Sequence, residues 1–177
     1  MPLVRKVSES EARESIKRYA VGVEYDGSRF HGWQRQFGVT TVQDLLEGAL
    51  SSVAAAPIRV ITAGRTDTGV HASGQVAHFD TLAERTALNW VRGTNTNLPE
   101  GLAVTWANEV DNRFHARFSA LSRKYRYILF CRDVRPTYLA QRVSWTYECL
   151  DVQRMCAAAI CLKGRHDFSA FRASGCQ

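Results

Sequence analysis

Tyr19, Val21, Val23 and Tyr25 alternate with the residues between them, and this period of two predicts a strand with one buried face over residues 19–25. The turn residues 26–28 end that strand. From residue 42 to residue 53, apolar side chains recur at helical spacing. This pattern predicts a helix, with Thr40 and Gln43 as its capping box.

The next 50 residues repeat the change from strand to helix. Residues 58–63 and 74–80 are predicted to be strands, and 102–107 a fourth. A second helix is predicted to begin at the capping pair Thr81 and Glu84, with Ala87, Leu88 and Val91 as its apolar stripe. Residues 93–101 are predicted to form a loop. The resulting βαββαβ order predicts an α+β fold of the ferredoxin-like kind.

A second block follows, in which strands are predicted at 123–131 and 144–147. A helix is predicted to begin after Asp151 and to end at Gly164, with Met155 in its apolar stripe. The expected division is a polar extension (1–18), a first domain (19–112) and the start of a second α/β domain (113–177). The second block is short for an independent core, so we expect it to be an incomplete domain.

Composition excludes several classes of protein. Hydrophobic residues make up 45% and charged residues 23%, which is typical of a globular chain. No apolar run reaches membrane-spanning length, and residues 1–17 lack the apolar region of a secretory signal. Five cysteines without a C-x-x-C spacing favour reduced thiols in the cytoplasm over a disulfide or metal framework. Cys156 and Cys161 are expected to be buried on the last helix.

The loop at residues 64–72 carries the most chemistry. Arg65 and Asp67 follow a predicted strand at i and i+2, so in an extended chain both side chains point the same way. A guanidinium beside a carboxylate keeps that carboxylate ionised. The alternative is a surface ion pair in a tight turn. In the loop at 26–35, Arg29 and Arg35 are candidates for phosphate contacts, and the alternative there is an ordinary loop around a packed Trp33.

The net charge of +6 is concentrated in one region. Residues 113–127 hold five Arg or Lys, no Asp or Glu, and four interleaved aromatic residues. Cations for phosphates beside aromatic planes for bases suit single-stranded or flipped nucleotides. The alternative is a solvated strand whose aromatic residues lie in a core. His78 and His166 are isolated histidines, for which a structural role is the simpler interpretation.

In this set of motifs the sequence resembles the tRNA pseudouridine synthase A family. The motifs occur in family order from about residue 19 to the last residue, and together they are very specific. They are EYDG (24–27), GWQRQ (32–36), AGRTD (63–67), GVH (69–71), GQV (74–76), NLP (97–99), FHARFSA (114–120), RKYRY (123–127), DF (167–168) and FR (171–172).

The resemblance implies a cofactor-free isomerase that converts uridine to pseudouridine in the tRNA anticodon stem-loop. It implies two α/β domains sharing one sheet, a cytoplasmic homodimer, and no metal. Asp67 is implied as the essential catalytic residue, Arg65 as its partner, and Tyr125 as the ring that stacks on the target uracil. The RNA-binding set expected from the resemblance and the basic region is Arg29, Arg35, Phe114, His115, Ala116, Arg117, Phe118, Arg123 and Lys124. Family members continue past residue 177, so we expect this chain to be a fragment.

The chemistry agrees with this interpretation. A base must leave the stack before its glycosidic bond can be broken and remade at C5. A fixed carboxylate can act in that reaction as nucleophile or as base, and the sequence does not choose between them. One alternative function is a non-catalytic RNA-binding module of the same βαββαβ order, although residues 74–79 lack the aromatic pair of such a module. Another is a protein-interaction domain with an incidental basic face.

Overall fold

A computed structural model describes residues 16–171 of the chain. It divides into two compact units, Met1–Tyr125 and Arg126–Gln177, which are described separately below. Most of the predicted extension lies outside the described residues, and strand β1 begins at Lys17. The predicted domain boundary at residue 112 stays a prediction.

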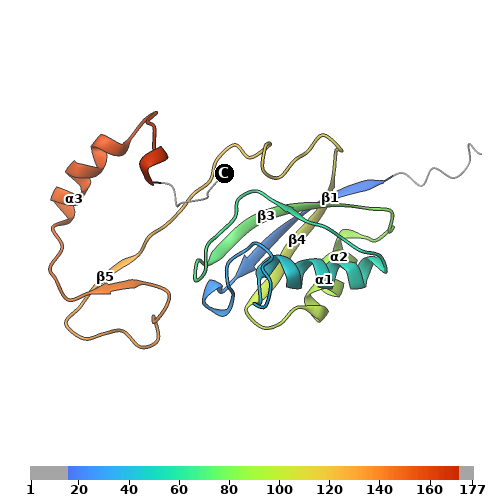
Figure 1. The fold of residues 1–177 in the computed structure, drawn as a ribbon, viewed down its shortest axis with the longest axis horizontal. Coiled ribbons are helices and arrows are strands. Elements are labelled where there is room, and N and C mark those ends of the chain that lie inside the picture. The colour runs from blue at the N-terminus through green and yellow to red at the C-terminus, as the bar shows by residue number, and fades with distance from the viewer. Residues whose placement is uncertain (1–15, 172–177) are drawn as a thin grey trace, which may run out of the picture. The chain divides into compact units, whose positions relative to one another are not determined.

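The first unit contains four strands and two α-helices (Figure 1). They are β1 (Lys17–Tyr25), the short 3-10 helix η1 (Gly27–Arg29), α1 (Val42–Ala54), β2 (Ile61–Thr62), β3 (Ala72–Thr81), α2 (Ala87–Asn97) and β4 (Leu102–Val110). The strands form one sheet in the order β2-β3-β1-β4, and every neighbouring pair is antiparallel. The α+β class that the sequence predicts is therefore confirmed.

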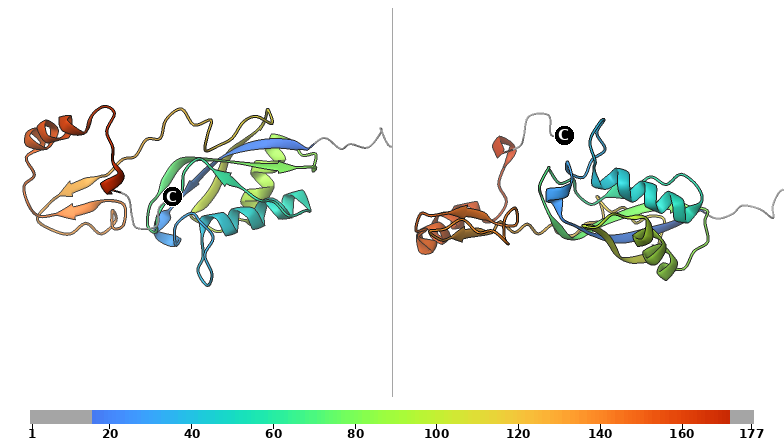
Figure 2. Two further views of the ribbon diagram at one scale, coloured as in Figure 1. Left: turned by 45° about the horizontal axis from the view of Figure 1, so that its top comes forward. Right: turned by 90° about the horizontal axis from the view of Figure 1, so that it is seen from below.

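The core of this unit lies between the sheet and its two helices. Figure 2 shows the ribbon from two further directions, in which α1 lies beside the strands. The alternating side chains of β1 that predicted a buried face are all in this core. Trp90 of α2 packs against Tyr19 and Phe79, with ring centroids 5.5 and 5.0 Å apart. The period of two therefore identified the buried face correctly.

Both predicted helix caps are wrong, although both helices exist. The N-cap of α1 is Thr41, whose hydroxyl accepts the Asp44 N–H and donates to the Asp44 carboxylate. The N-cap of α2 is Thr86, five residues after the predicted Thr81. Each region contains two threonines that could cap the helix, Thr40 and Thr41 before α1 and Thr81 and Thr86 before α2. Local sequence alone does not decide which of the two is the N-cap.

The buried face of α2 also differs from the prediction. Trp90 and Thr94 are its buried residues, whereas Leu88 of the predicted stripe is 54% exposed. Val91 of the predicted stripe does pack against the core. The stripe is only partly right, because one inward position is occupied by a threonine, which apolar periodicity does not count. The helix also continues to Asn97, through part of the predicted loop at 93–101.

The second predicted strand is reduced to the two residues of β2. Upstream of it, Ile58 and Val60 are buried, but their N–H groups donate to the Ser51 hydroxyl and the Glu47 carboxylate of α1. Backbone donors that are bound to a helix cannot join a strand ladder. The β-rich composition of residues 58–63 therefore produces an extended segment rather than a full strand.

The second unit contains β5 (Leu129–Cys131), β6 (Ser144–Thr146), α3 (Val152–Ala159) and the 3-10 turns η2 (Ile160–Leu162) and η3 (Ser169–Phe171). Strands β5 and β6 pair in parallel. Asp151 caps α3 by accepting the Arg154 N–H, as predicted. The predicted strand at 123–131 forms only at its last three residues.

Among the described residues of the second unit only Pro136 is buried, and every other apolar side chain there is exposed or half-buried. Met155, expected in a core, is 43% exposed, and Cys156 and Cys161 are exposed as well. The prediction of buried thiols is therefore wrong for the described chain. The predicted helix is present as α3 but ends at Ala159, short of the predicted Gly164, and none of its residues is buried, so its apolar stripe stays a prediction.

Candidate functional site

The loop between β2 and β3, which carries Arg65 and Asp67, is held by hydrogen bonds to several neighbouring segments. The Thr66 carbonyl accepts the Trp33 N–H at 2.9 Å, and the Thr66 hydroxyl bonds the Tyr25 hydroxyl at 2.8 Å. The Gly64 carbonyl accepts the Gln75 side-chain amide at 2.7 Å. These bonds fix the loop backbone on both sides of Arg65.

Both predicted catalytic side chains are exposed on this loop. Within residues 16–171, neither the Asp67 carboxylate nor the Arg65 guanidinium makes a hydrogen bond or an ion pair. The structure thus presents a solvent-facing carboxylate on a restrained backbone. The predicted pairing of Arg65 with Asp67 is not formed here and stays a prediction for the substrate-bound state.

The far end of the loop contacts the turn after β1. A Cβ on Gly27 would lie 2.0 Å from the Val70 carbonyl oxygen, so only glycine allows this approach. The Gly27 N–H donates to His71 Nδ1 at 3.2 Å, and the Asp26 carboxylate lies 3.1 Å from the same nitrogen. The EYDG and GVH motifs, 45 residues apart in sequence, therefore form one contact.

Tyr125 lies beside the same loop. Arg123 donates two hydrogen bonds to the Ala63 carbonyl, at 2.7 and 3.0 Å, which brings the RKYRY segment to the end of β2. The Tyr125 hydroxyl is 3.8 Å from the place that a Cβ on Gly64 would take. Its side chain is 73% exposed. A free aromatic ring thus stands next to the backbone that carries Asp67.

Burial raises the pKa of the neighbouring Tyr25, and the proximity of Tyr125 raises it further, while hydrogen bonds from Thr66 and Gln75 act in the opposite direction. Tyr25 is therefore a neutral phenol at pH 7. Its hydroxyl serves as a hydrogen-bonding anchor for the loop and not as a base.

The FHARF segment is fastened to the face of the sheet opposite the helices. Arg18 of β1 forms a two-bond ion pair with Asp80 of β3, at 2.6 and 2.7 Å. The same guanidinium donates to the carbonyls of Asn112 and Phe114, at 2.7 and 2.8 Å. A planar guanidinium with five donors is suited to binding a carboxylate and two carbonyls together.

His78 provides a second attachment for this segment. Its ring is buried, and its Nδ1 accepts the Ala116 N–H at 3.1 Å, which requires the neutral ring. Burial lowers the pKa of His78, and the charges of Arg18 and His115 lower it further. The structural interpretation of His78 agrees with this environment. A hydrogen bond from Arg18 lowers the pKa of Asp80 and keeps it ionised.

The residues of the predicted RNA-binding set differ in how exposed they are and in whether they already bind other residues of the protein. Arg117, Phe118, Arg123 and Lys124 are exposed, and His115 stacks on Phe118 with Arg117 also against that ring. Ala116 is buried. Arg29 pairs with Glu100, and Arg35 pairs with Asp44 and Glu47. Contacts of these residues with RNA stay predictions, and the two loop arginines already have protein partners.

The sequence pattern assigned no role to Arg18, Thr66 or Glu47, whose side chains hold these segments through hydrogen bonds. The sequence does contain a hint of the Arg18–Asp80 ion pair. Arg18 directly precedes one predicted strand and Asp80 ends another, so opposite charges stand at the ends of two strands. Their pairing depends on strand register, which was not predicted. No local pattern marks Thr66 as an anchor.

Among residues 16–171, no group of three His, Cys, Asp or Glu side chains is arranged to hold a metal ion. No helix in the described part is both long enough and apolar enough to span a membrane.

Comparison with known proteins identifies relatives. Residues 22–119 match the family model described as tRNA pseudouridine synthase. The chain is 53% identical over 176 residues to a tRNA pseudouridine synthase A of Pseudomonas aeruginosa, covering 99% of this chain and 62% of the relative. It is 52% identical over 162 residues to one of Coxiella burnetii, covering 92% and 62%, and 55% identical over 162 residues to one of Paraburkholderia xenovorans, covering 92% and 60%. The chain thus spans about three fifths of the length of these relatives.

Proposed function

Because the chain belongs to the tRNA pseudouridine synthase family, we propose that its protein isomerises uridine to pseudouridine in the anticodon stem-loop of tRNA. Asp67 is the catalytic carboxylate of this proposal. Arg65 assists it, and Tyr125 stacks on the target base. No cofactor is required, because the reaction exchanges one bond of the uracil for another within the same nucleotide.

The observation that carries the proposal is the exposed Asp67 carboxylate on a backbone-restrained loop with the free Tyr125 ring beside it. Catalysis requires a reacting group that is held by its surroundings and yet open to substrate. An aromatic ring next to the carboxylate supplies a stacking surface for a uracil that has left the helix. A surface ion pair in a turn would need neither of these features.

The reaction assigns separate tasks to these residues. The N1–C1′ bond breaks, the uracil turns, and C5 bonds to C1′; C5 then loses its proton and N1 takes one up, so that the product is an isomer of the substrate. Asp67 either attacks the nucleotide and is later displaced, or removes a proton from it. Both schemes use the oxygen atoms of the carboxylate, which an amide at this position does not replace.

The RNA surface of the proposal consists of the exposed members of the basic region, foremost Arg117, Phe118, Arg123 and Lys124. Cations and stackable rings alternate there, as they do in proteins that bind unpaired nucleotides. We further propose a cytoplasmic homodimer and a ferredoxin-like first domain. The strand order β2-β3-β1-β4, with βαββαβ connectivity, supports the latter.

The test is an Asp67→Asn substitution in the full-length protein, with tritium release from tRNA labelled at C5 of uridine as the assay. The amide is nearly isosteric but can neither attack nor accept a proton, so turnover should be lost while tRNA binding is kept. Asp133→Asn, at an exposed aspartate of the second unit, is the matched control and should react normally. Turnover close to wild type in Asp67→Asn would refute the assignment. If the wild-type protein binds tRNA but releases no tritium, the alternative of a non-catalytic RNA-binding module holds.

A further inference from the structure

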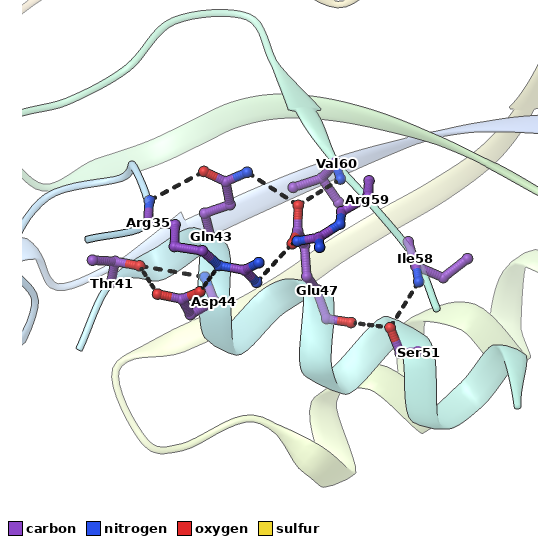
Figure 3. A network of polar contacts seen from close by, with 9 residues as sticks. All are labelled: Arg35, Thr41, Gln43, Asp44, Glu47, Ser51, Ile58, Arg59 and Val60. Carbon is purple, nitrogen blue, oxygen red and sulfur yellow. Dashed lines mark hydrogen bonds and ion pairs between the residues drawn. The ribbon is translucent and has the colours of Figure 1, made fainter. Parts of the chain in front are cut away.

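Glu47 of α1 is a carboxylate that is only 3% exposed and is surrounded by hydrogen-bond donors (Figure 3). Its Oε2 accepts from Arg35 at 2.9 Å and from Arg59 at 3.0 Å. Its Oε1 accepts from the Gln43 side chain at 3.0 Å and from the Val60 N–H at 2.9 Å. Four donors, two of them cationic, compensate for the loss of water around this charge.

One set of contacts leads from Glu47 to the loop that braces Thr66. Arg35 binds Glu47 and Asp44, and the Arg35 N–H donates to the side chain of Gln43 at 3.2 Å. Burial opposes ionisation of Asp44, but hydrogen bonds from Thr41 and Arg35 outweigh it and lower the pKa of that carboxyl. The charged network therefore fastens the loop at residues 30–35 to the first two turns of α1.

The loop at residues 30–35 is in direct contact with the backbone of Thr66, next to Asp67. The Trp33 N–H donates to the Thr66 carbonyl, and its own carbonyl accepts the Gln43 N–H at 3.0 Å. Gly32 adopts a φ of +78°, and a Cβ there would be 2.8 Å from the Thr66 carbonyl oxygen. The two loops are therefore in backbone contact, and a shift of one would move the other.

The second set of contacts reaches the catalytic loop from its other side. The Val60 N–H, which Glu47 accepts, immediately precedes β2. Two residues after β2 the chain reaches Gly64, the first residue of the loop motif. Strand β2 pairs with β3 at only two residues, and the Ala63 N–H donates to the Val76 carbonyl just after it. Upstream of β2, the Glu47–Val60 bond joins the Ser51–Ile58 bond in holding the chain that leads to the loop.

We propose that Glu47 is a positioning residue for Asp67, acting through both backbone segments that meet at the 64–67 loop. This inference rests on the proposed function, because it assigns Glu47 a part in the chemistry of Asp67. In this proposal Arg35 is not an RNA contact, and its role is to bind the carboxylates of Glu47 and Asp44. An apolar residue could fill the same space, but it would not fix the two segments through directed bonds.

The experiment compares Glu47→Gln with Leu50→Val in the full-length protein. The glutamine keeps the shape but offers one donor where four donors converge, so two of the four bonds are lost whichever way the amide lies. Leu50→Val weakens the core from the same helix without touching the network. Glu84→Gln, at an exposed carboxylate near Lys17, repeats the chemical change on the surface. Circular dichroism identifies a temperature at which all variants are folded.

Two readouts are measured at that temperature. The first is steady-state tritium release, in which Glu47→Gln should lower kcat about 10–100-fold with the Kd for tRNA within about twofold of wild type. The second is amide hydrogen exchange, in which the Trp33 and Val60 amides should exchange at least about tenfold faster while the central Val21 amide is unchanged. Leu50→Val and Glu84→Gln should leave kcat and the Trp33 amide as in wild type.

The two readouts separate this inference from the proposed function. If the wild type releases tritium and Glu47→Gln matches it, the positioning role is refuted and the function stands. If Leu50→Val lowers kcat as much as Glu47→Gln, general destabilisation explains the effect and the inference is likewise refuted. If the wild type releases no tritium, the proposed function fails, and unchanged Trp33 exchange in Glu47→Gln then refutes the coupling on its own.

Discussion

The contact between Gly27 and the 70–71 backbone gives a quantitative prediction. In Gly27→Ala the new methyl would lie 2.0 Å from the Val70 carbonyl oxygen and 2.3 Å from its carbonyl carbon. Both are backbone atoms, so no side-chain rotation relieves the clash. The turn and the loop must separate by about 1 Å to reach the 3.0 Å that Cβ contacts tolerate.

That separation has two costs. Forcing a methyl group into a filled space typically costs about 1–3 kcal/mol. The hydrogen bond from the Gly27 N–H to His71, already 3.2 Å long, would be lost at about 0.5–1.5 kcal/mol. We therefore expect Gly27→Ala to lower the free energy of unfolding by about 1.5–4.5 kcal/mol.

Urea denaturation followed by the fluorescence of the buried Trp33 and Trp90 measures this change. Gly48→Ala is the matched control, because Gly48 lies inside α1 with no atom within 4 Å of the added Cβ. It should raise the free energy of unfolding by about 0.5–1 kcal/mol, since alanine is the better helix former. Equal midpoints for the two variants would refute the argument from close approach.

Three further predictions concern side chains. Thr94→Val should raise the free energy of unfolding by about 1 kcal/mol, since the buried Thr94 hydroxyl has no partner in the described chain; a lower urea midpoint would contradict this. Because the pKa of the folded His78 is lowered, the unfolded chain takes up a proton first, and stability should be lost as the pH falls from 6.5 toward that lowered value. His78→Asn, which can still accept from Ala116, should show a smaller loss between pH 7.5 and 5.5 in urea titrations; equal losses would exclude His78 as the source. Tyr125→Ala should weaken tRNA binding by about 1–3 kcal/mol and Tyr125→Phe far less, as measured by filter binding, and unchanged affinity of the alanine variant would remove its stacking role.

Local pattern sufficed where neighbours in sequence share one face. The alternation in β1 and the helical spacing in α1 predicted both elements, because one face of each is buried against the same core. The local pattern predicted a strand at residues 58–60 that does not form, because the Ile58 and Val60 N–H groups donate to side chains of α1. That competition involves residues 7 and 13 positions away in sequence, and no short window contains it.

The candidate site divides in the same way. The resemblance to a known family marked Asp67 as the catalytic residue and Tyr125 as the stacking ring, and the spacing of Arg65 and Asp67 after a predicted strand agrees with the first of these. The contacts that hold those segments were not predictable, since Arg18 reaches Phe114 across 96 positions and depends on the register of β1 with its neighbours. The apolar face of α3 was predicted from its stripe, but a stripe does not specify what packs on it.

The central place of β1 in the sheet has a consequence for synthesis of the protein. Its partners are made much later, since Arg18 pairs with Val110, roughly 90 residues further along the chain. At about 5–20 residues per second, a ribosome needs about 5–20 s to add them. Until β3 has been made, Tyr19, Val21 and Val23 belong to an apolar strand without a neighbour on either edge, and the edge that β4 covers stays open for the whole of that time. The nascent chain therefore carries an unpaired apolar segment near its beginning, which is covered only when β4 closes the sheet.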